Sequence, residues 1–144
     1  MPHRKLKAIV SQRPLVIGSP DTSVLVAVKA MKEKGVGSVL VTEANSLVGI
    51  FTERDLMNRV IAEELAPQNT LLSQVMTEKV IGLEADKPLS HALHLMHQHG
   101  FRHVPVLEQG KPVGIVSARD ALGIEWQDFE RELKLADDIA EILA

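Results

Sequence analysis

The stretch that decides the fold is Gly49-Ile50-Phe51-Thr52-Glu53-Arg54-Asp55, because it returns as Gly114-Ile115-Val116-Ser117-Ala118-Arg119-Asp120. The two copies end longer segments, 21–55 and 86–120, which align without a gap and are identical at about a third of their positions. A repeat of this kind is the signature of one structural unit used more than once. We therefore expect two similar units that each present the same motif.

Each unit is predicted to fold as strand, helix, strand, strand, helix, because β-branched runs alternate with apolar residues at helical spacing. In the first unit the strands are expected at 15–17, 36–42 and 47–51, and the helices from 24 to the stop at Gly35 and over 53–65. In the second unit the strands are expected at 80–83, 104–107 and 113–116, and the helices over 88–99 and from Arg119. Ser19-Pro20-Asp21 is a helix-start signal, and short lead-ins at 6–11 and 72–77 precede the two units.

A chain of 144 residues makes about one domain, so the two marginal halves are expected to share one core. The predicted fold class is α+β. Two β-α-β-β-α repeats pack around a pseudo-twofold axis, leave two equivalent clefts, and are followed by a C-terminal helix. The predicted divisions are 1–66 for the first repeat with its lead-in, 67–122 for the second repeat, and 123–144 for the helix.

Composition excludes several functional classes. A formal charge of -3 gives no electrostatic footprint for nucleic acid or an anionic membrane, although the N-terminus carries a few basic residues. No apolar run approaches the length of a membrane span, and no signal peptide is recognisable. The absence of cysteine excludes disulfides, thiolate zinc sites and a cysteine nucleophile. We expect a cytoplasmic protein.

The repeated motif combines groups that suit a nucleotide. Thr52 and Ser117 stand where a helix begins, a position that favours an anion such as phosphate. Asp55 and Asp120, three residues later, could accept two hydrogen bonds from the vicinal diol of a ribose. The same Thr-x-x-Asp and Ser-x-x-Asp spacing also describes a helix-capping box, so a purely structural role stays open.

The preceding glycine and the following arginine extend the motif. The glycine would let a ligand approach the backbone closely. Arg54 and Arg119 add planar donor forks that match phosphate. Because both residues are retained in both copies, we favour the ligand site over simple capping.

These residues resemble a tandem pair of CBS domains, named after cystathionine β-synthase, over residues 6–122. The second half resembles the family more closely, through Gly100-Phe101-Arg102-His103-Val104-Pro105-Val106 followed by the motif at 114–120. The first half departs from the pattern at Gly37-Ser38-Val39-Leu40-Val41, which has Leu40 where the family often has proline and lacks the Arg-His pair.

The resemblance implies regulatory, non-catalytic binding of an adenosine-containing ligand such as AMP, ADP, ATP, NAD(H) or S-adenosylmethionine. Asp55 and Asp120 would hold riboses, and Thr52, Ser117, Arg54 and Arg119 would approach phosphates. Each cleft would be completed by the other repeat. The Asp120 pocket would add Val16 with neighbouring Leu15 and Ile17, Val36, Gly37 and Ser38, and phosphate contacts from Arg102 and His103, whereas the Asp55 pocket would borrow Ile81 within 80–83 and Phe101 to His103. Val104 and Pro105 complete the predicted nucleotide-binding set.

The two predicted pockets differ in charge. Arg102 and His103 stand in the second repeat where the first has Gly37 and Ser38. We therefore expect the Asp120 pocket to bind nucleotide more tightly. A solvated charge at a strand edge is the alternative for Arg102.

Four histidines, His91, His94, His97 and His99, lie within nine residues of a predicted helix. No two of them are four residues apart, the spacing that places a chelating pair on one helix face. We interpret them as a polar face with pH-dependent charge, with metal binding as the alternative.

The tail has a heptad pattern formed by Leu122, Trp126, Phe129, Leu133, Ala136, Ala140 and Leu143. This seam could pair with a second copy, dock on its own core, or bind another protein. The sequence thus predicts a non-catalytic nucleotide sensor that acts as a homodimer on a protein target in trans. The first alternative is a ligand-free interaction scaffold. An enzyme is the weakest alternative, because no nucleophile with an adjacent base is apparent in the sequence.

Overall fold

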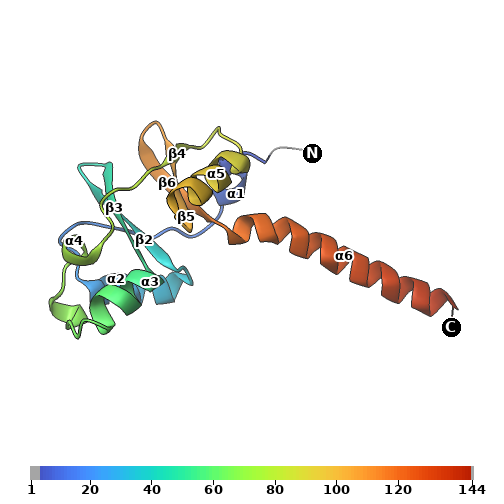
Figure 1. Ribbon diagram of the computed structural model, residues 1–144, viewed down its shortest axis with the longest axis horizontal. Helices are drawn as coiled ribbons and strands as arrows, with labels where there is room; N and C mark the ends of the chain where they lie inside the picture. Colours follow the sequence, from blue (N-terminus) through green and yellow to red (C-terminus); the bar gives the residue numbers. More distant parts are fainter. Residues whose placement is uncertain (1–3, 144) are drawn as a thin grey trace.

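The structure, a computed structural model, describes residues 4–143 and, within the last helix, the side chains of all but residues 122–130. Two small α/β units lie beside each other, and one long helix projects away from them (Figure 1). The first half of the chain contains α1 (Leu6–Val10), β1 (Ile17–Gly18), α2 (Val24–Lys34), β2 (Ser38–Glu43), β3 (Ser46–Thr52), α3 (Glu53–Asp55) and the π-helical η1 (Leu56–Ile61). The second half contains the 3-10 turn η2 (Pro67–Asn69), α4 (Leu72–Val75), β4 (Leu83–Glu84), α5 (Leu89–His99), β5 (His103–Glu108), β6 (Lys111–Ser117) and α6 (Arg119–Leu143).

The two sheets are copies of one design. In the order β1-β2-β3 and β4-β5-β6, the first pair of strands is parallel and the second antiparallel. Each hairpin has an irregularity at the equivalent place, after Val41 in the first and after Val106 in the second. The α+β class and the repeated strand-helix-strand-strand order are therefore confirmed.

The helix ends follow local chemistry. Ser23 caps α2 by accepting a hydrogen bond from the backbone N–H of Val26, so the helix begins at Val24 as expected, shortly after the Ser19-Pro20-Asp21 signal. Gly35 and Gly100 end α2 and α5 with φ of 67° and 71°, the left-handed conformation in which glycine has no steric penalty.

The first strand of each repeat and the helix after β3 are shorter than predicted. β1 and β4 each have only two residues, because each pairs with its neighbour at only two positions. The helix expected over 53–65 ends at Ile61, and Glu64 follows with φ of 57°.

The two cores exchange their lead-in helices. Leu72 and Val75 of α4 pack in the core of the first repeat, although α4 precedes the second repeat. Leu6 and Val10 of α1 pack in the core of the second repeat, although α1 precedes the first. Each core is therefore built from residues on both sides of the linker at 62–71.

The repeated glycines have a packing role in this exchange. A Cβ on Gly49 would collide with the side chain of Met76, and a Cβ on Gly114 would collide with Val10. The close approach that we attributed to a ligand is therefore made at both glycines by the residue that ends or follows a lead-in helix.

The last helix leaves the domain. In the first repeat, fully buried Val60 holds η1 against the core, whereas the equivalent sequence position in α6 is Glu125. Residues 131–143 are all exposed, so the alternative in which the tail docks on its own core is wrong for these residues. The part of the heptad at 122–129 lies outside the described side chains. Among the helices described over 4–143, none has both the length and the apolar character to cross a bilayer.

Candidate functional site

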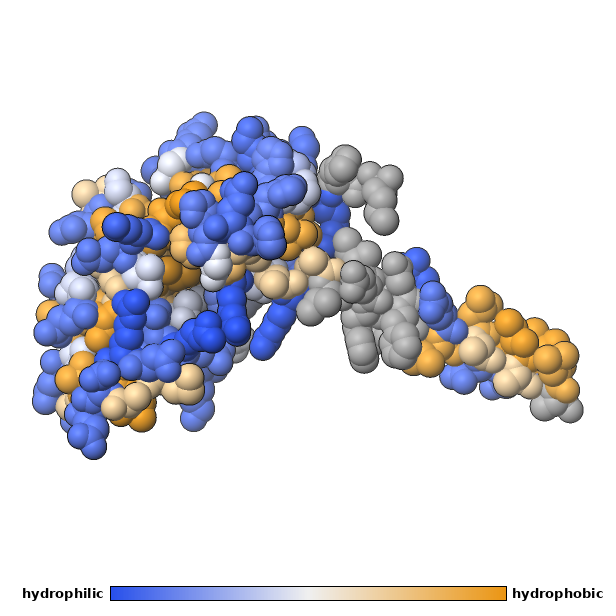
Figure 2. Space-filling view, in the orientation of Figure 1, coloured by the Kyte–Doolittle hydropathy of each residue, from blue (hydrophilic) through white to orange (hydrophobic). Residues whose placement is uncertain are grey.

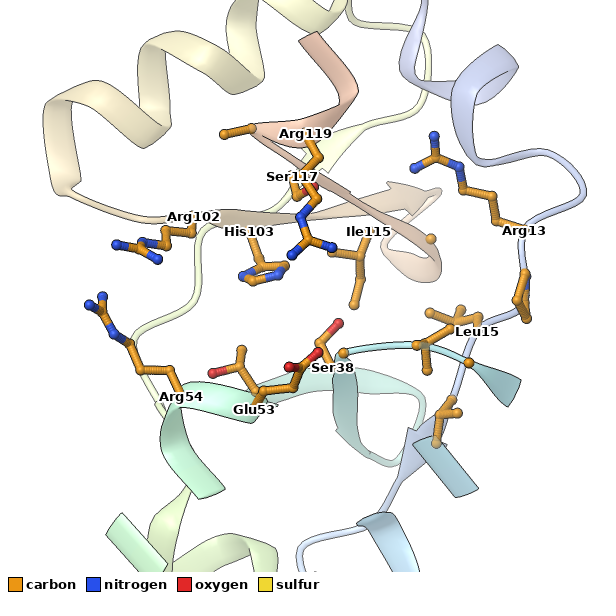
Figure 3. Close-up of a pocket in the computed structure, with 18 of the residues that line it drawn as sticks. Arg13, Leu15, Ser38, Glu53, Arg54, Arg102, His103, Ile115, Ser117 and Arg119 are labelled. Carbon is orange, nitrogen blue, oxygen red and sulfur yellow. The ribbon is translucent and has the colours of Figure 1, made fainter. Parts of the chain in front are cut away.

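A cavity of about 880 Å³ lies between the two repeats, within the size range of small-molecule sites. Its walls come from the loop before β1, the start of β2 and the β3–α3 junction of the first repeat, and from the start of β5 and the β6–α6 junction of the second. Figure 3 shows side chains of the second repeat, including His103 and Arg119, facing Ser38 and Glu53 of the first across this space. The repeats therefore build this site together, and the first repeat adds the loop before β1, whose counterpart before β4 does not line it.

The cavity concentrates positive charge. Arg13, Arg54, Arg102 and Arg119 line it from four separate places in the chain, against one acidic lining residue, Glu53 (Figure 3). Arginine forks bind phosphate and carboxylate with paired hydrogen bonds. The arrangement suits an anionic ligand that contacts both repeats.

Asp120 lies beside this cavity with both carboxylate oxygens engaged. Its Oδ2 accepts a hydrogen bond from the backbone N–H of Ser117 at 2.7 Å. Its Oδ1 lies 2.5 Å from Nη2 of Arg13, and only 6% of its side chain is exposed. The backbone carbonyl of Asp120 also accepts a hydrogen bond from Arg4. Asp120 thus fastens the start of α6 to both ends of the N-terminal segment.

Asp55 makes the complete capping box anticipated as the structural alternative. Its Oδ2 accepts from the backbone N–H of Thr52 at 3.0 Å, and the Thr52 hydroxyl accepts from the backbone N–H of Asp55 at 3.3 Å. Arg59 lies one turn later with its Nε 3.6 Å from Oδ1. Neither aspartate is among the residues that line the cavity, so a ribose role requires rearrangement or approach from the rim.

The other predicted site residues divide into two groups. The cavity is lined by Val16, Gly37, Ser38, Thr52, Arg54, Arg102, His103, Ser117 and Arg119. It is not lined by Ile81, Phe101, Val104 or Pro105. Val104 and Pro105 are fully buried, Ile81 is exposed, and the Phe101 ring stacks on His99.

Arg13 and Glu53 line the cavity but were not among the predicted residues. Glu53 occupies the variable position of the repeated motif, where the second copy has Ala118. Arg13 lies in a loop outside both repeats and matches no motif. Only its approach to Asp120, across more than a hundred residues of sequence, identifies it.

His103 is the titratable group with a clear pKa shift in this cavity. Burial lowers its pKa from the usual value, and the charges of Arg119 and Arg102 act in the same direction. Glu53 and Asp55 oppose the shift. At neutral pH the imidazole is therefore neutral, and an incoming phosphate would favour its protonated form.

The other histidines are separate from the site. His91, His94 and His97 are exposed on α5, and His99 is occupied by the stack with Phe101. Among the residues whose side chains are described, no three His, Asp or Glu side chains gather in a way that could hold a metal ion.

The two halves of the chain match one known domain. A sequence model of the CBS domain matches residues 6–62 and again residues 72–125. The chain belongs to the CBS domain family. This CBS pair is 38% identical over 119 residues to an uncharacterized protein of Methanopyrus kandleri, MK0525. The matched region makes up 81% of this chain and 60% of that relative's length.

Solved CBS structures share the fold. The CBS domain pair of protein MJ0100, in complex with 5′-methylthioadenosine and S-adenosyl-L-methionine, has a TM-score of 0.76 at 24% identity over 88% of this chain and 99% of that chain. The CBS domain protein PAE2072 from Pyrobaculum aerophilum, complexed with AMP, has a TM-score of 0.72 at 23% identity over 81% and 89%. At these identities the likeness concerns the fold.

Proposed function

We propose that this CBS pair is a non-catalytic sensor of adenine nucleotides, AMP, ADP or ATP, which bind between the repeats. The observation that carries the proposal is the cavity lined by four arginines drawn from both halves of the chain. A ligand that bridges such a cavity favours one arrangement of the repeats over another, which is the thermodynamic requirement for a sensor.

The choice of nucleotide follows from charge. The same fold holds AMP in PAE2072 and holds sulfur-containing adenosine compounds in MJ0100. A phosphate complements the arginines, whereas the sulfonium of S-adenosylmethionine adds a positive charge to a positive site. We therefore rank adenine nucleotides above S-adenosylmethionine, with NAD(H), which carries a pyrophosphate, between them.

Asp55 and Asp120 are proposed to hold ribose hydroxyls, and the Asp120 side to bind more tightly. His103 and Arg102 line the cavity near Arg119, which supports a stronger phosphate site there. Titration of D55A and D120A variants with AMP by calorimetry tests the ranking. We expect D120A to lose more affinity than D55A; equal losses would contradict it.

Action on a partner in trans is proposed through α6. Figure 2 shows an apolar surface over the distal part of this helix, formed within the described side chains by Leu133, Leu135, Ile139, Ile142 and Leu143, all of them exposed. Exposed apolar faces of this kind mark interaction sites. We also propose a homodimer, which light scattering at micromolar concentration would test.

The test of the function itself is a thermal and calorimetric titration of the purified chain. A ligand at 100 times its dissociation constant adds about 2.7 kcal/mol to the stability of the folded state. No heat and no thermal shift with AMP, ADP, ATP or NAD(H) would refute the sensor. The second candidate, a ligand-free scaffold, would then be favoured by the observation that both aspartates already cap their own helices.

A further inference from the structure

The two equivalent aspartates differ in what holds them. Oδ1 of Asp120 is held by Arg13, which itself lines the cavity. Oδ1 of Asp55 is approached by Arg59, which does not line the cavity and donates from Nη1 to the carbonyl oxygens of Val75 and Met76. Only the Asp120 side therefore couples its carboxylate to a cation that a ligand can reach.

A ribose can reach Asp120 in one way. Oδ2 is held by the backbone N–H of Ser117, the last residue of β6, which cannot turn away without disturbing the junction between β6 and α6. Oδ1 is held by the Arg13 side chain, of which 46% is exposed, on the loop between α1 and β1. Because only 6% of the Asp120 side chain is exposed, the diol must displace or share the guanidinium at Oδ1.

The displaced guanidinium needs a new acceptor. A nucleotide brings one in its phosphate, since Arg13 already stands at the wall of the same cavity as Arg102 and Arg119. Adenosine brings the diol without the phosphate and would leave the guanidinium without a replacement for the carboxylate. The ion pair between Arg13 and Asp120 thus opposes the binding of an uncharged nucleoside. When a nucleotide binds, this ion pair is replaced by one between Arg13 and the phosphate.

Resting on the proposed function, we infer that Arg13 is the residue that makes the cleft select phosphorylated ligands over their nucleosides. In the empty site the Arg13 guanidinium pairs with the Asp120 carboxylate, and in the filled site it pairs with the ligand phosphate. Arg13 is a specificity-determining contact that no part of the repeated motif contains.

The test compares AMP with adenosine in wild type and R13A by isothermal titration calorimetry. A hydrogen bond to a charged group is worth about 1.5–3 kcal/mol, so loss of the phosphate contact in R13A should weaken AMP binding at least about tenfold relative to adenosine. A half-exposed ion pair is worth at most about 1 kcal/mol, so its removal should tighten adenosine binding up to about fivefold and offset the loss of AMP affinity by the same factor. The affinity ratio of AMP to adenosine should therefore fall by more than about tenfold.

The matched control is K7A. This substitution removes one positive charge from the same N-terminal segment, as R13A does. Lys7, however, forms an exposed ion pair with Glu108 at 3.9 Å, and neither residue lines the cavity. K7A should leave the ratio unchanged. If R13A fails to fold, as judged by thermal unfolding, R13K replaces it. Lysine keeps the charge without the planar fork, so the ratio should still fall, and an unchanged ratio would overturn the inference.

The outcomes separate the inference from the function on which it rests. Equal weakening of AMP and adenosine in R13A, or no change in either, would overturn the role of Arg13 while leaving the sensor intact. So would a crystal structure with AMP bound in which Arg13 still pairs with Asp120. Failure of wild type to bind AMP, ADP, ATP and NAD(H) alike would remove the proposed function and the inference with it.

Discussion

Truncation of one side chain before the first repeat should weaken the second repeat. Leu6 is fully buried and packs in the core that contains Val104, Val106 and Val116. A buried Leu→Ala substitution costs about 2–5 kcal/mol through lost transfer free energy and the cavity that remains. Since small domains have about 5–15 kcal/mol in total, L6A should remove a large share of the free energy of unfolding.

Amide hydrogen exchange locates where that free energy is lost. Every 1.4 kcal/mol corresponds to a tenfold change in an equilibrium constant, so an opening that exposes the Leu6 site should become at least about thirtyfold more frequent. We expect faster exchange in β5 and β6, with β2 and β3 less affected. Mass spectrometry of peptides from the two hairpins measures both in one experiment.

The matched variant is L72A, because Leu72 is equally buried in the other lead-in helix and packs in the first core. It should give the opposite distribution, with faster exchange in β2 and β3. If L6A instead loosened the first hairpin more than the second, the exchange of lead-in helices between the cores would be refuted.

Further predictions concern the repeated glycine, the buried histidine and the projecting helix. G114A should destabilise the fold by about 1–3 kcal/mol and more than G49A in urea unfolding, because a Cβ at 114 meets the stiff, buried Val10, whereas a Cβ at 49 meets a flexible methionine; equal losses would contradict this. The folded-state pKa of His103 lies below its unfolded value of about 6.5. The stability that the neutral imidazole contributes is therefore present above pH 6.5 and is lost as the pH falls toward the folded-state pKa. Wild type should accordingly lose more stability than H103N between pH 7.5 and 5.5 in thermal unfolding. Deletion of residues 131–144 should leave the melting temperature of the two-repeat unit unchanged, since the described residues 131–143 are exposed, and a large drop would show that they pack on it.

The sequence predicted the parts of the fold that depend on near neighbours. The hairpins follow from β-branched runs, and the ends of α2 and α5 follow from Gly35 and Gly100, whose role depends only on local φ. Leu6 carries no sign that it belongs to a core more than seventy residues away in sequence. A lead-in read along the chain is assigned to the repeat that follows it, and here the tertiary contacts decide otherwise.

The site shows the same division. The cross-repeat wall with Val16, Gly37 and Ser38 was expected, and these residues do line the cavity with Ser117 and Arg119. The sequence could not decide whether the carboxylates of Asp55 and Asp120 cap their helices or bind ribose, because both roles use the same spacing. Arg13 could not be found at all, since its significance arises only from its distance to Asp120.

The traded lead-in helices make the two halves interdependent in assembly. A fragment cut between η2 and α4 would lack the helix that fills its own interior and would carry one shaped for a different interior. The order of synthesis then matters, because α1 emerges from the ribosome long before the strands that shelter it, and the chain can close only after nearly all of it has been made.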